Sequence, residues 1–449
     1  MINRHNLVYY TLTIVFWLYA TIGFVSEEVL PPLASVRPVL TLLLDGVIAL
    51  MGLALLRARN DVWIVISFAV IAVLSAYVNH TGMMMFMNGF REFVGVLFVL
   101  PVMRFLLSGC RGAEFQRKFD RQLYIFLWVQ VFCLVEQFVR YGANDHGGGS
   151  FGNFSSGAIS TAIYTISFYL MTRRWNQDWN YAQNLAKNWV LIFLLFPTLL
   201  NETKVSFVYL LIYFLLLFKL NRAYVFKVLC ALPFMVAALI AVGYFYIQAT
   251  GENADYVFSA DTMEMYLAGG DAEDEFIEIA QMAQDNPGME DINDWIVDLP
   301  RFTKIFMMDN LLKTERGGML LGAGLGQFKG GTMVQSSEFA KTNDWYLRGT
   351  RPLTVFLFIQ LGWLGFIWYL MTMWTDFNMK HNYGGALGKN VQWFILLLTL
   401  IFLFYIDAIR NLPLCVILFY VLATSTVQRG ESCENEQHGD ESSHMPQLR

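Results

Sequence analysis

Four basic side chains stand at the ends of long apolar runs: Arg140, Lys204, Arg351 and Arg410. An arginine donates two parallel hydrogen bonds to phosphate oxygens, and a lysine supplies a compact positive charge. If the apolar runs cross a membrane in alternating directions, all four cations reach the same surface, where they can converge on one pyrophosphate. We predict this binding role for Arg351, Arg140 and Lys204. For Arg410 we favour the alternative, a side chain anchored among lipid headgroups.

A long polar segment, residues 250–351, supplies more candidate residues. Its first half, residues 250–300, carries fourteen acidic residues and no Lys or Arg, whereas residues 301–351 carry eight basic and four acidic ones. The basic half contains the run Gly322-Ala-Gly-Leu-Gly326-Gln-Phe328, and glycines let backbone N–H groups approach a ligand closely. We therefore predict that this half binds an anionic substrate. The predicted residues are Arg348, which joins Arg351 in binding pyrophosphate, and Arg301, Arg316, Gly322, Gly324 and Gly326.

This glycine run does not predict a nucleotide site, because no strand precedes it and no Gly-Lys-Ser/Thr sequence follows it. Residues 250–351 contain no His or Cys, and their carboxylates lack the spacing of a calcium loop. We therefore predict neither a metal nor a cofactor. The acidic half is interpreted as a solvated face.

The residues after Arg140 form a glycine-rich loop that includes His146-Gly-Gly-Gly-Ser-Phe-Gly152-Asn153. Three consecutive glycines disfavour regular structure, so we predict a bent loop with exposed backbone. Gly152 and Asn153 are predicted to bind substrate, and a flexible connector is the alternative interpretation. His146 and Glu136 are the candidates for a general base, which the sequence does not identify.

Charged residues inside the apolar runs form a further group. A charge at the centre of a membrane helix costs about 2.5–3.5 kcal/mol on insertion scales, so such residues face a cavity or a partner. Arg91 has two interpretations: it binds substrate, or it forms a structural ion pair with Asp45 or Glu92. Both interpretations stay open at this point.

The composition predicts a membrane protein. Of the 449 residues, 56% are hydrophobic and 15% are charged, against about 25% charged residues in soluble domains. The net charge of −5 carries little information, because acidic and basic residues are concentrated in different segments of the chain. Nucleic acid is not an expected partner.

None of the five cysteines lies in residues 250–351, so no disulfide framework is expected there. The first apolar run lacks a small-residue cleavage pattern, which favours a retained span over a removed signal peptide.

The elements that must position these residues are membrane helices. A bilayer core needs about 20 apolar residues per helix, and twelve runs qualify or nearly qualify. We predict an all-α polytopic fold of about twelve transmembrane helices, with one large, partly helical periplasmic loop between the ninth and tenth. The predicted spans are residues 8–26, 38–56, 62–79, 83–103, 122–140, 155–172, 187–201, 205–220, 225–248, 352–374, 391–407 and 411–427. The predicted domains are 1–248 (spans 1–9), 249–351 (the large loop), 352–427 (spans 10–12) and 428–449 (a disordered cytoplasmic tail).

Basic residues in the short loops predict the orientation of these spans. With the N-terminus in the cytoplasm, one side collects most of the loop Lys and Arg residues, among them Arg57 and Arg104, and the other side holds few. We therefore predict cytoplasmic termini and an outward-facing loop, which in a double-membrane bacterium is periplasmic. Apolar spacing also predicts helices at residues 272–284 and 301–313 that lie on the membrane surface.

Together these features resemble the superfamily of O-antigen polymerases and O-antigen ligases, which are bacterial integral-membrane glycosyltransferases. The resemblance covers the second to the twelfth predicted span. Ser150-Phe-Gly-Asn153 resembles the Phe-Gly-Asn stretch that follows the family's fifth span. The run of residues 322–328 resembles its glycine-rich segment late in the large loop. Arg351, followed by ten residues and Gly362, resembles a motif of the polymerases.

Three departures from the family bear on function. Ligases place a His where Arg351 stands, about eleven residues before the glycine that Gly362 matches, so the sequence favours a polymerase. The corresponding first-loop motif is imperfect, because eleven residues separate Arg140 from Gly152. Many members carry a Ser-Arg pair where this chain has Thr203-Lys204, which keeps the charge and loses the bidentate fork.

The resemblance implies that the chain polymerises undecaprenyl-pyrophosphate-linked oligosaccharide repeat units into O-antigen, capsular or exopolysaccharide at the periplasmic face of the inner membrane. It implies membrane lipids, a flippase and a chain-length regulator as partners. Gly362 is then a predicted substrate-binding residue. One alternative is an O-antigen ligase that transfers glycan to a lipid A core or another acceptor. An alternative from another class is a lipid-linked sugar transporter or flippase, whose mark would be paired broken helices and internal repeats.

Overall fold

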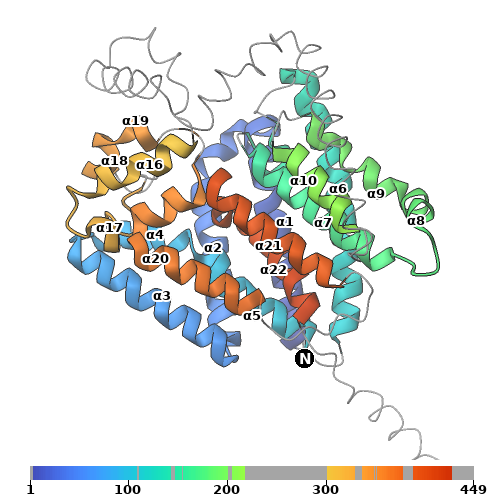
Figure 1. Ribbon diagram of the computed structural model, residues 1–449, viewed down its shortest axis with the longest axis horizontal. Coiled ribbons are helices and arrows are strands. Elements are labelled where there is room, and N and C mark those ends of the chain that lie inside the picture. The colour runs from blue at the N-terminus through green and yellow to red at the C-terminus, as the bar shows by residue number, and fades with distance from the viewer. Residues whose placement is uncertain are drawn as a thin grey trace, which may run out of the picture.

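The structure is a computed structural model that describes residues 4–108, 111–142, 147–153, 155–200, 205–217, 301–328, 336–347, 349, 351–377 and 388–426. Within these ranges every regular element is a helix (Figure 1). The first part of the bundle contains α1 (Arg4–Phe24), α2 (Arg37–Leu55), α3 (Arg59–Val78), α4 (Met83–Arg91), α5 (Val94–Leu107), α6 (Gly112–Tyr141), α7 (Ser156–Arg174), α8 (Tyr181–Lys187), α9 (Trp189–Phe193) and α10 (Val205–Leu217). The second contains α16 (Arg301–Leu312), α17 (Gly318–Leu321), α18 (Glu338–Thr342), α19 (Asp344–Leu347), α20 (Leu353–Phe377), α21 (Gly388–Tyr405) and α22 (Leu412–Thr426). Short turns of other helix types are η1 (Val25–Val29), η2 (Pro31–Ser35), η3 (Gly149–Phe151), η4 (Phe196–Leu199) and η5 (Ala408–Arg410).

Several described helices are long and apolar enough to cross a membrane. Five qualify by length and hydropathy: Arg4–Val29, Arg37–Leu55, Arg59–Val78, Gly112–Tyr141 and Leu353–Thr375. Shorter apolar helices accompany them at Val94–Leu107, Trp189–Leu199, Val205–Leu217, Lys389–Tyr405 and Leu412–Ser425. The chain is therefore a helical membrane protein. The total of twelve spans and the periplasmic loop stay predictions, and residues 225–248, 272–284 and the tail lie outside the described residues.

Most predicted helix positions agree with the structure. The predicted spans 38–56, 155–172 and 411–427 correspond closely to α2, α7 and α22. The predicted helix 301–313 is also confirmed, as α16. Two predictions are wrong in extent: α6 begins at Gly112 rather than near residue 122, and the described residues of the predicted span 187–201 form short pieces, α9 and η4, instead of one helix.

The prediction of a single helix over residues 83–103 is also wrong, because a turn at Glu92 and Phe93 separates α4 from α5. At the end of α4 the Glu92 N–H bonds the Gly89 carbonyl and the Phe93 N–H bonds the Phe90 carbonyl, so the helix tightens and stops. The break turns Glu92 towards α20, where a glutamine donates to its carboxylate. A polar contact thus interrupts a run that hydropathy treats as continuous.

Helix α20 is interrupted in the same way. Gly362, with φ of 60° and ψ of −155°, is not helical and divides α20 into two pieces. An ideal Cβ at Gly362 would lie 2.4 Å from the Leu320 carbonyl carbon, since the backbone of α17 packs directly against this glycine. Gly322 faces the same joint, where a Cβ would lie 2.5 Å from the Phe358 carbonyl oxygen. Only glycines let the two backbones approach so closely.

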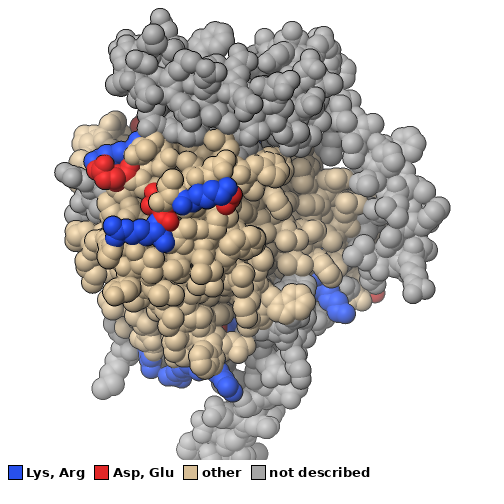
Figure 2. All heavy atoms as spheres, turned by 60° about the vertical axis from the view of Figure 1, so that its left-hand side comes forward, with Lys and Arg blue, Asp and Glu red and all other residues tan. Residues whose placement is uncertain are grey.

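Charged side chains separate to two ends of the bundle. We call them the Arg4 end, where α1 begins and α5 finishes, and the Arg351 end, where α20 begins. The first is marked by a hydrogen bond of 3.0 Å between the His5 ring and the Leu106 carbonyl and by the Arg104–Asp61 ion pair. In Figure 1 the N-terminus lies below and α16, α18 and α19 lie above. The left half of the face in Figure 2 shows charged side chains above and below a belt of uncharged ones, as expected of a bilayer-spanning surface.

Candidate functional site

The turn between α4 and α5 places a carboxylate at the Arg351 end. Glu92 Oε2 accepts a hydrogen bond of 2.6 Å from Gln360 Nε2 on α20, and Glu92 Oε1 lies 2.7 Å from Arg410 Nη2 on η5. Gln360 in turn accepts a 2.6 Å hydrogen bond from the Gly326 N–H at its side-chain oxygen. Three segments far apart in the sequence therefore meet at Glu92.

Arg410 joins this carboxylate to a second one. Its Nη1 lies 2.7 Å from Asp407 Oδ2, and the Nε of Arg351 lies 3.9 Å from the same oxygen. All four side chains are largely buried, with Arg351 15% exposed and Arg410 26% exposed. We call Arg351, Asp407, Arg410 and Glu92 the arginine–carboxylate cluster.

The two arginines of this cluster differ in how strongly the carboxylates hold them. Arg410 contacts both carboxylates at 2.7 Å, whereas Arg351 approaches Asp407 only at 3.9 Å. Burial alone would raise the pKa of Asp407, but the charges of Arg410 and Arg351 outweigh it and hold that pKa below its ordinary value of 3.8. Arg410 is therefore the nearer counter-charge of Asp407, and Arg351 is the more distant one.

An aromatic ring supports the Arg351 guanidinium. Arg351 Cζ lies 4.5 Å from the centroid of the Phe328 ring, and Arg410 Cζ lies 5.9 Å from the same ring. Contacts of this kind orient a guanidinium and contribute about 0.5–2 kcal/mol depending on desolvation. Arg351 Nη1 also donates a 2.8 Å hydrogen bond to the Leu347 carbonyl, the last residue of α19. The ring and the carbonyl fix the guanidinium plane before any ligand arrives.

The glycine-rich run is folded against the helices in the described structure. Its Ala323 N–H donates a 2.8 Å hydrogen bond to the Ile359 carbonyl, and a Cβ at Gly326 would lie 2.0 Å from the Met85 carbonyl oxygen. Gly324 has φ of 114°, which L side chains rarely adopt. These contacts give the glycines a packing role that holds Phe328 under Arg351. Substrate binding by Gly322, Gly324, Gly326 and Gly362 stays a prediction.

Arg140 belongs to a separate group of charges at the same end. Its Nη1 lies 3.2 Å from Glu28 Oε2, its Nε pairs with Glu136, and Tyr141 Oη donates a 2.7 Å hydrogen bond to Glu28. The neighbouring Glu27 carboxylate pairs with an arginine of α2 and accepts the Asn153 N–H. Arg140 thus contacts two carboxylates outside the arginine–carboxylate cluster.

The described part of the glycine-rich loop is bent, as predicted, but its backbone is not exposed. Residues 147–152 are buried, because two glutamines of α6 hold the turn. The Ser150 N–H donates to Gln130 Oε1 at 2.9 Å, and the Gly149 N–H donates to Gln137 Oε1 at 2.8 Å. Gly152 has φ of 94°, and a Cβ there would lie 2.7 Å from the Glu27 carboxylate. The flexible-connector interpretation is wrong for these residues.

Arg91 forms the ion pair that one of its two interpretations predicts, while substrate binding by Arg91 stays a prediction. Its Nε lies 2.5 Å from Asp45 Oδ2, and its Nη2 donates a 3.0 Å hydrogen bond to Thr41 Oγ1. The predicted partner Asp45 is therefore confirmed. Arg91 also directly precedes Glu92 in the chain, so this pair holds the turn that carries the cluster.

For Arg410 the favoured interpretation, an anchor among lipid headgroups, is wrong. A snorkelling side chain keeps its charged group in the headgroup region, whereas Arg410 points inward and is shared by Glu92 and Asp407. The physical reason is the pair of acidic partners, which compensate a buried guanidinium.

The remaining predicted residues are distributed as follows. Arg301 Cζ lies 4.2 Å from the Tyr405 ring centroid, and its Nε is buried without a hydrogen-bond partner in the described structure. Arg316 is exposed in the turn after α16. Lys204, Arg348 and His146 lie outside the described residues.

Sequence reasoning missed three contributors to this site: Gln360, Phe328 and the Leu347 carbonyl. Gln360 offered a signal, because it is the one amide side chain in the apolar sequence of α20. The ion pair between Asp407 and Arg410 also had a signal in the sequence, since their three-residue spacing allows such a pair within one turn. Phe328 and Leu347 offered none, because only the fold brings them to Arg351.

The described residues include no group of three or more His, Cys, Asp or Glu side chains arranged to hold a metal ion. No protein-family model matches the chain, and no curated protein matches it at a significant level.

Proposed function

We propose that this protein is a glycosyltransferase that polymerises undecaprenyl-pyrophosphate-linked oligosaccharide units at the periplasmic face of a bacterial inner membrane. The observation that carries the proposal is the setting of Arg351. Its guanidinium lies at one end of a membrane bundle, 4.5 Å from the Phe328 ring centroid and hydrogen-bonded at 2.8 Å to the Leu347 carbonyl. A fixed cation at that level suits a phosphate carried by a membrane lipid.

In this mechanism the donor supplies its own leaving group, since a pyrophosphate departs readily from a sugar carbon. Arg351 binds pyrophosphate oxygens and offsets the charge that develops as the glycosidic bond breaks. Arg410 keeps Asp407 and Glu92 neutralised so that they do not repel the donor. The protein holds the acceptor hydroxyl near the anomeric carbon of the donor, so that its oxygen bonds to that carbon as the carbon–pyrophosphate bond breaks. Undecaprenyl pyrophosphate leaves, and the hydroxyl proton passes to water. Asp407 is a poor proton acceptor because its pKa is lowered.

The direct test is polymerisation in a defined system. Purified protein in liposomes would receive a lipid-linked repeat unit, and the products would be separated by chain length. We expect a ladder of longer lipid-linked glycans, which disappears with Arg351→Ala. A wild-type protein that leaves the repeat unit unchanged would refute the proposal. Transfer of a finished glycan to a lipid A core acceptor, without a ladder, would indicate a ligase.

A transporter of lipid-linked sugar is the second candidate, favoured by one observation. The helix breaks at residues 92–93 and at Gly362 lie close together, joined by the 2.6 Å Glu92–Gln360 hydrogen bond. Interrupted helices that meet inside a bundle are typical of transporters. The same liposomes distinguish the two, because a transporter would move a fluorescent lipid-linked sugar between leaflets without elongating it.

A further inference from the structure

Methionines gather on the exposed side of α4. The helix begins Met83-Met84-Met85-Phe-Met87, and Met83, Met84 and Met87 are 72%, 67% and 54% exposed. We call these three the α4 methionines. Apart from Met371 on α20, every other exposed large apolar side chain in the described structure is aliphatic or aromatic. Contact with lipid therefore does not explain three neighbouring thioethers, since aliphatic and aromatic side chains provide that contact elsewhere in the bundle.

The α4 methionines share one face of the helix. Met83 and Met87 are four residues apart, and Met84 and Met87 are three residues apart, so their Cβ atoms are neighbours at about 5–6 Å. At 3.6 residues per turn, Gly89 lies on the opposite face. That face packs against the glycine-rich run, because a Cβ at Gly89 would lie 2.2 Å from the Gly326 nitrogen. The three thioethers thus lie on the outer side of a helix whose inner side is fixed.

A histidine stands beside these methionines in a conformation that favours glycine. His80 has φ of 50°, and no other non-glycine residue in the described structure has a positive φ. It follows the end of α3, where the Thr81 N–H bonds the Ala76 carbonyl at 2.9 Å. The His80 N–H bonds the Tyr77 carbonyl at 3.3 Å, and glycine is the usual residue in this type of helix end. An exposed imidazole therefore stands three residues before Met83, where the backbone alone favours glycine.

The glycine-rich run and the turn before it hold both sides of this segment. The Gly317 N–H donates a 2.9 Å hydrogen bond to Asn79 Oδ1, and Asn79 Nδ2 donates a 3.1 Å hydrogen bond to the Gly322 carbonyl. Gly89 is held by Gly326 in the same way. Residues 79–89 are thus fixed at both ends, and a ligand set on a fixed backbone loses less conformational freedom on binding. Because α3 is long enough to cross a membrane, its end lies at the membrane surface, where an ion has access.

We propose that His80 and the α4 methionines bind one Cu(I) ion. Thioether sulfur is a soft ligand that selects Cu(I), and imidazole also binds copper. The set contains neither thiolates nor carboxylates, so it is unlike the sites that zinc and calcium prefer. It is separate from the arginine–carboxylate cluster, and the proposed transfer reaction needs no metal. The proposal therefore does not rest on the proposed function.

The first test measures metal binding by the whole protein, purified in nanodiscs. Its five cysteines are replaced by alanine, because thiolates also bind soft metals. Cu(I) is titrated without oxygen against a coloured Cu(I) chelator, and Ag(I) serves as a second probe that does not change its oxidation state. We expect one Cu(I) per chain, which excess Mg(II) does not displace. A protein that takes no Cu(I) from the chelator would overturn the proposal.

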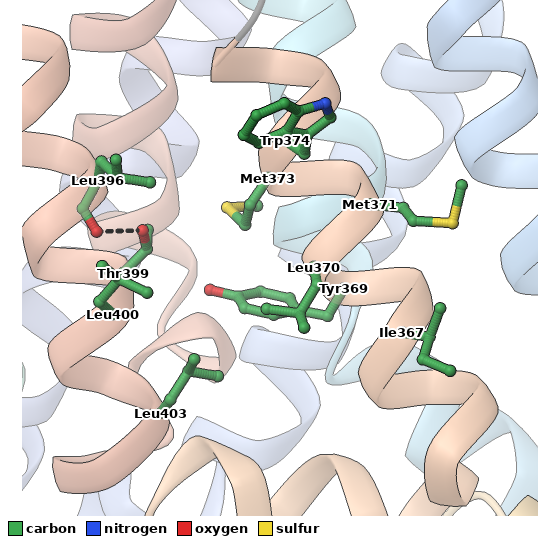
Figure 3. A pocket seen from close by; sticks show the side chains of 10 residues that line it. All are labelled: Ile367, Tyr369, Leu370, Met371, Met373, Trp374, Leu396, Thr399, Leu400 and Leu403. Carbon is green, nitrogen blue, oxygen red and sulfur yellow. Dashed lines mark hydrogen bonds between the residues drawn. The ribbon is translucent and has the colours of Figure 1, made fainter.

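Replacing the α4 methionines by leucine tests the sulfur ligands. Leucine keeps the volume and apolar character of methionine and removes the sulfur. The triple variant should bind Cu(I) at least tenfold more weakly, since loss of even an outer partner costs about 10–100-fold in metal affinity. The control is Met371→Leu, a side chain that is 64% exposed and extends from α20 away from α21 (Figure 3). Unchanged affinity in the triple variant, or an equal loss in Met371→Leu, would contradict the site.

His80→Gly separates a metal ligand from a residue that only forms the turn. Glycine suits a φ of 50°, so this variant should unfold at the same temperature as the parent protein or at a higher one. As the loss of a ligand, the change should also weaken Cu(I) binding at least tenfold and remove a nitrogen neighbour from the X-ray absorption spectrum of the bound copper. A stable His80→Gly protein with unchanged Cu(I) affinity would show that His80 is not a ligand and would refute the proposed set.

Discussion

Arg351 and Arg410 lie at different distances from the Asp407 carboxylate that they share. Arg410 is held at 2.7 Å by both Glu92 and Asp407, so removing it would take the nearest counter-charge from two buried carboxylates and leave Asp407 with only the more distant Arg351. Arg351 stands farther from Asp407 and is oriented by a ring and a backbone carbonyl. We therefore expect changes at Arg410 to affect folding and changes at Arg351 to affect turnover.

Replacing Arg351 tests this assignment. A charge-assisted hydrogen bond is worth about 1.5–3 kcal/mol, so Arg351→Ala should lower turnover by about tenfold to more than a hundredfold. Arg351→Lys should recover only part, because it keeps the charge and loses the fork and the stacking on Phe328. The effect of each variant is measured as glycan chain length in a complemented deletion strain, compared with the level of the protein in the membrane. Long chains from Arg351→Ala at normal levels would remove Arg351 from the site.

Asp407 carries a pH prediction. A carboxylate whose pKa is lowered in the folded state stabilises the fold above its unfolded-state pKa and loses this contribution as the pH falls through the folded-state pKa. Asp407→Asn should therefore lower the free energy of unfolding by about 3 kcal/mol. The deficit should be constant from neutral pH down to about 4 and shrink only below the ordinary pKa of 3.8. Thermal unfolding in detergent at several pH values measures it. A deficit that vanishes near pH 6 would contradict the pairing with Arg410.

At the scale of elements, two helix breaks build the site. The turn between α4 and α5 places Glu92 against Gln360 and Arg410, and the break at Gly362 accommodates the backbone of α17. Gln360 lies two residues before the second break and bonds both Glu92 and the Gly326 N–H. The breaks therefore hold α4, α20 and the glycine-rich run in one arrangement.

Gly362→Ala tests whether this joint is required. A non-glycine residue in a left-handed conformation costs about 1–2 kcal/mol, and the methyl group would also meet the Leu320 backbone at 2.4 Å. The variant should unfold at a clearly lower temperature and accumulate poorly in membranes. Gly46→Ala in α2 is the control, since a Cβ there meets nothing within 4 Å and alanine favours a helix. Equal melting temperatures for the two variants would show that α17 does not pack on Gly362.

At the scale of the whole molecule, the two charged ends predict opposite exposure across the membrane. The Arg351 end should face outward and the Arg4 end should face the cytoplasm, as the basic loop residues predict. Ser35 and Asn60 are exposed positions at the two ends.

Cysteine labelling tests this orientation. In a background whose five cysteines are replaced by alanine, Ser35→Cys should react with a membrane-impermeant maleimide on intact cells. Asn60→Cys should react only after the cells are opened, because the reagent does not cross the membrane. An extracytoplasmic reporter fused near Asn286 should be active, and one fused after Val427 should be silent. The reverse pattern would place Arg351 in the cytoplasm and exclude a periplasmic polymerase.

The sequence by itself determined the class of the molecule and most helix positions. Apolar runs of about twenty residues specify membrane helices through the cost of exposing backbone to lipid, which does not depend on the neighbours of a helix. The same reasoning found the Arg91–Asp45 pair, because an isolated charge inside a span requires a partner.

Only the tertiary structure decided where helices break and which charges meet. Hydropathy averages over a window, so one turn at Glu92 or one glycine at 362 leaves no trace in it. Arg410 resembled a lipid anchor in the sequence because its partners include Glu92, more than three hundred residues away in the chain. Phe328 reaches Arg351 only through the packing of glycine backbones on α20 and α4. Contacts between distant segments depend on how helices pack together, which local patterns of residues do not encode.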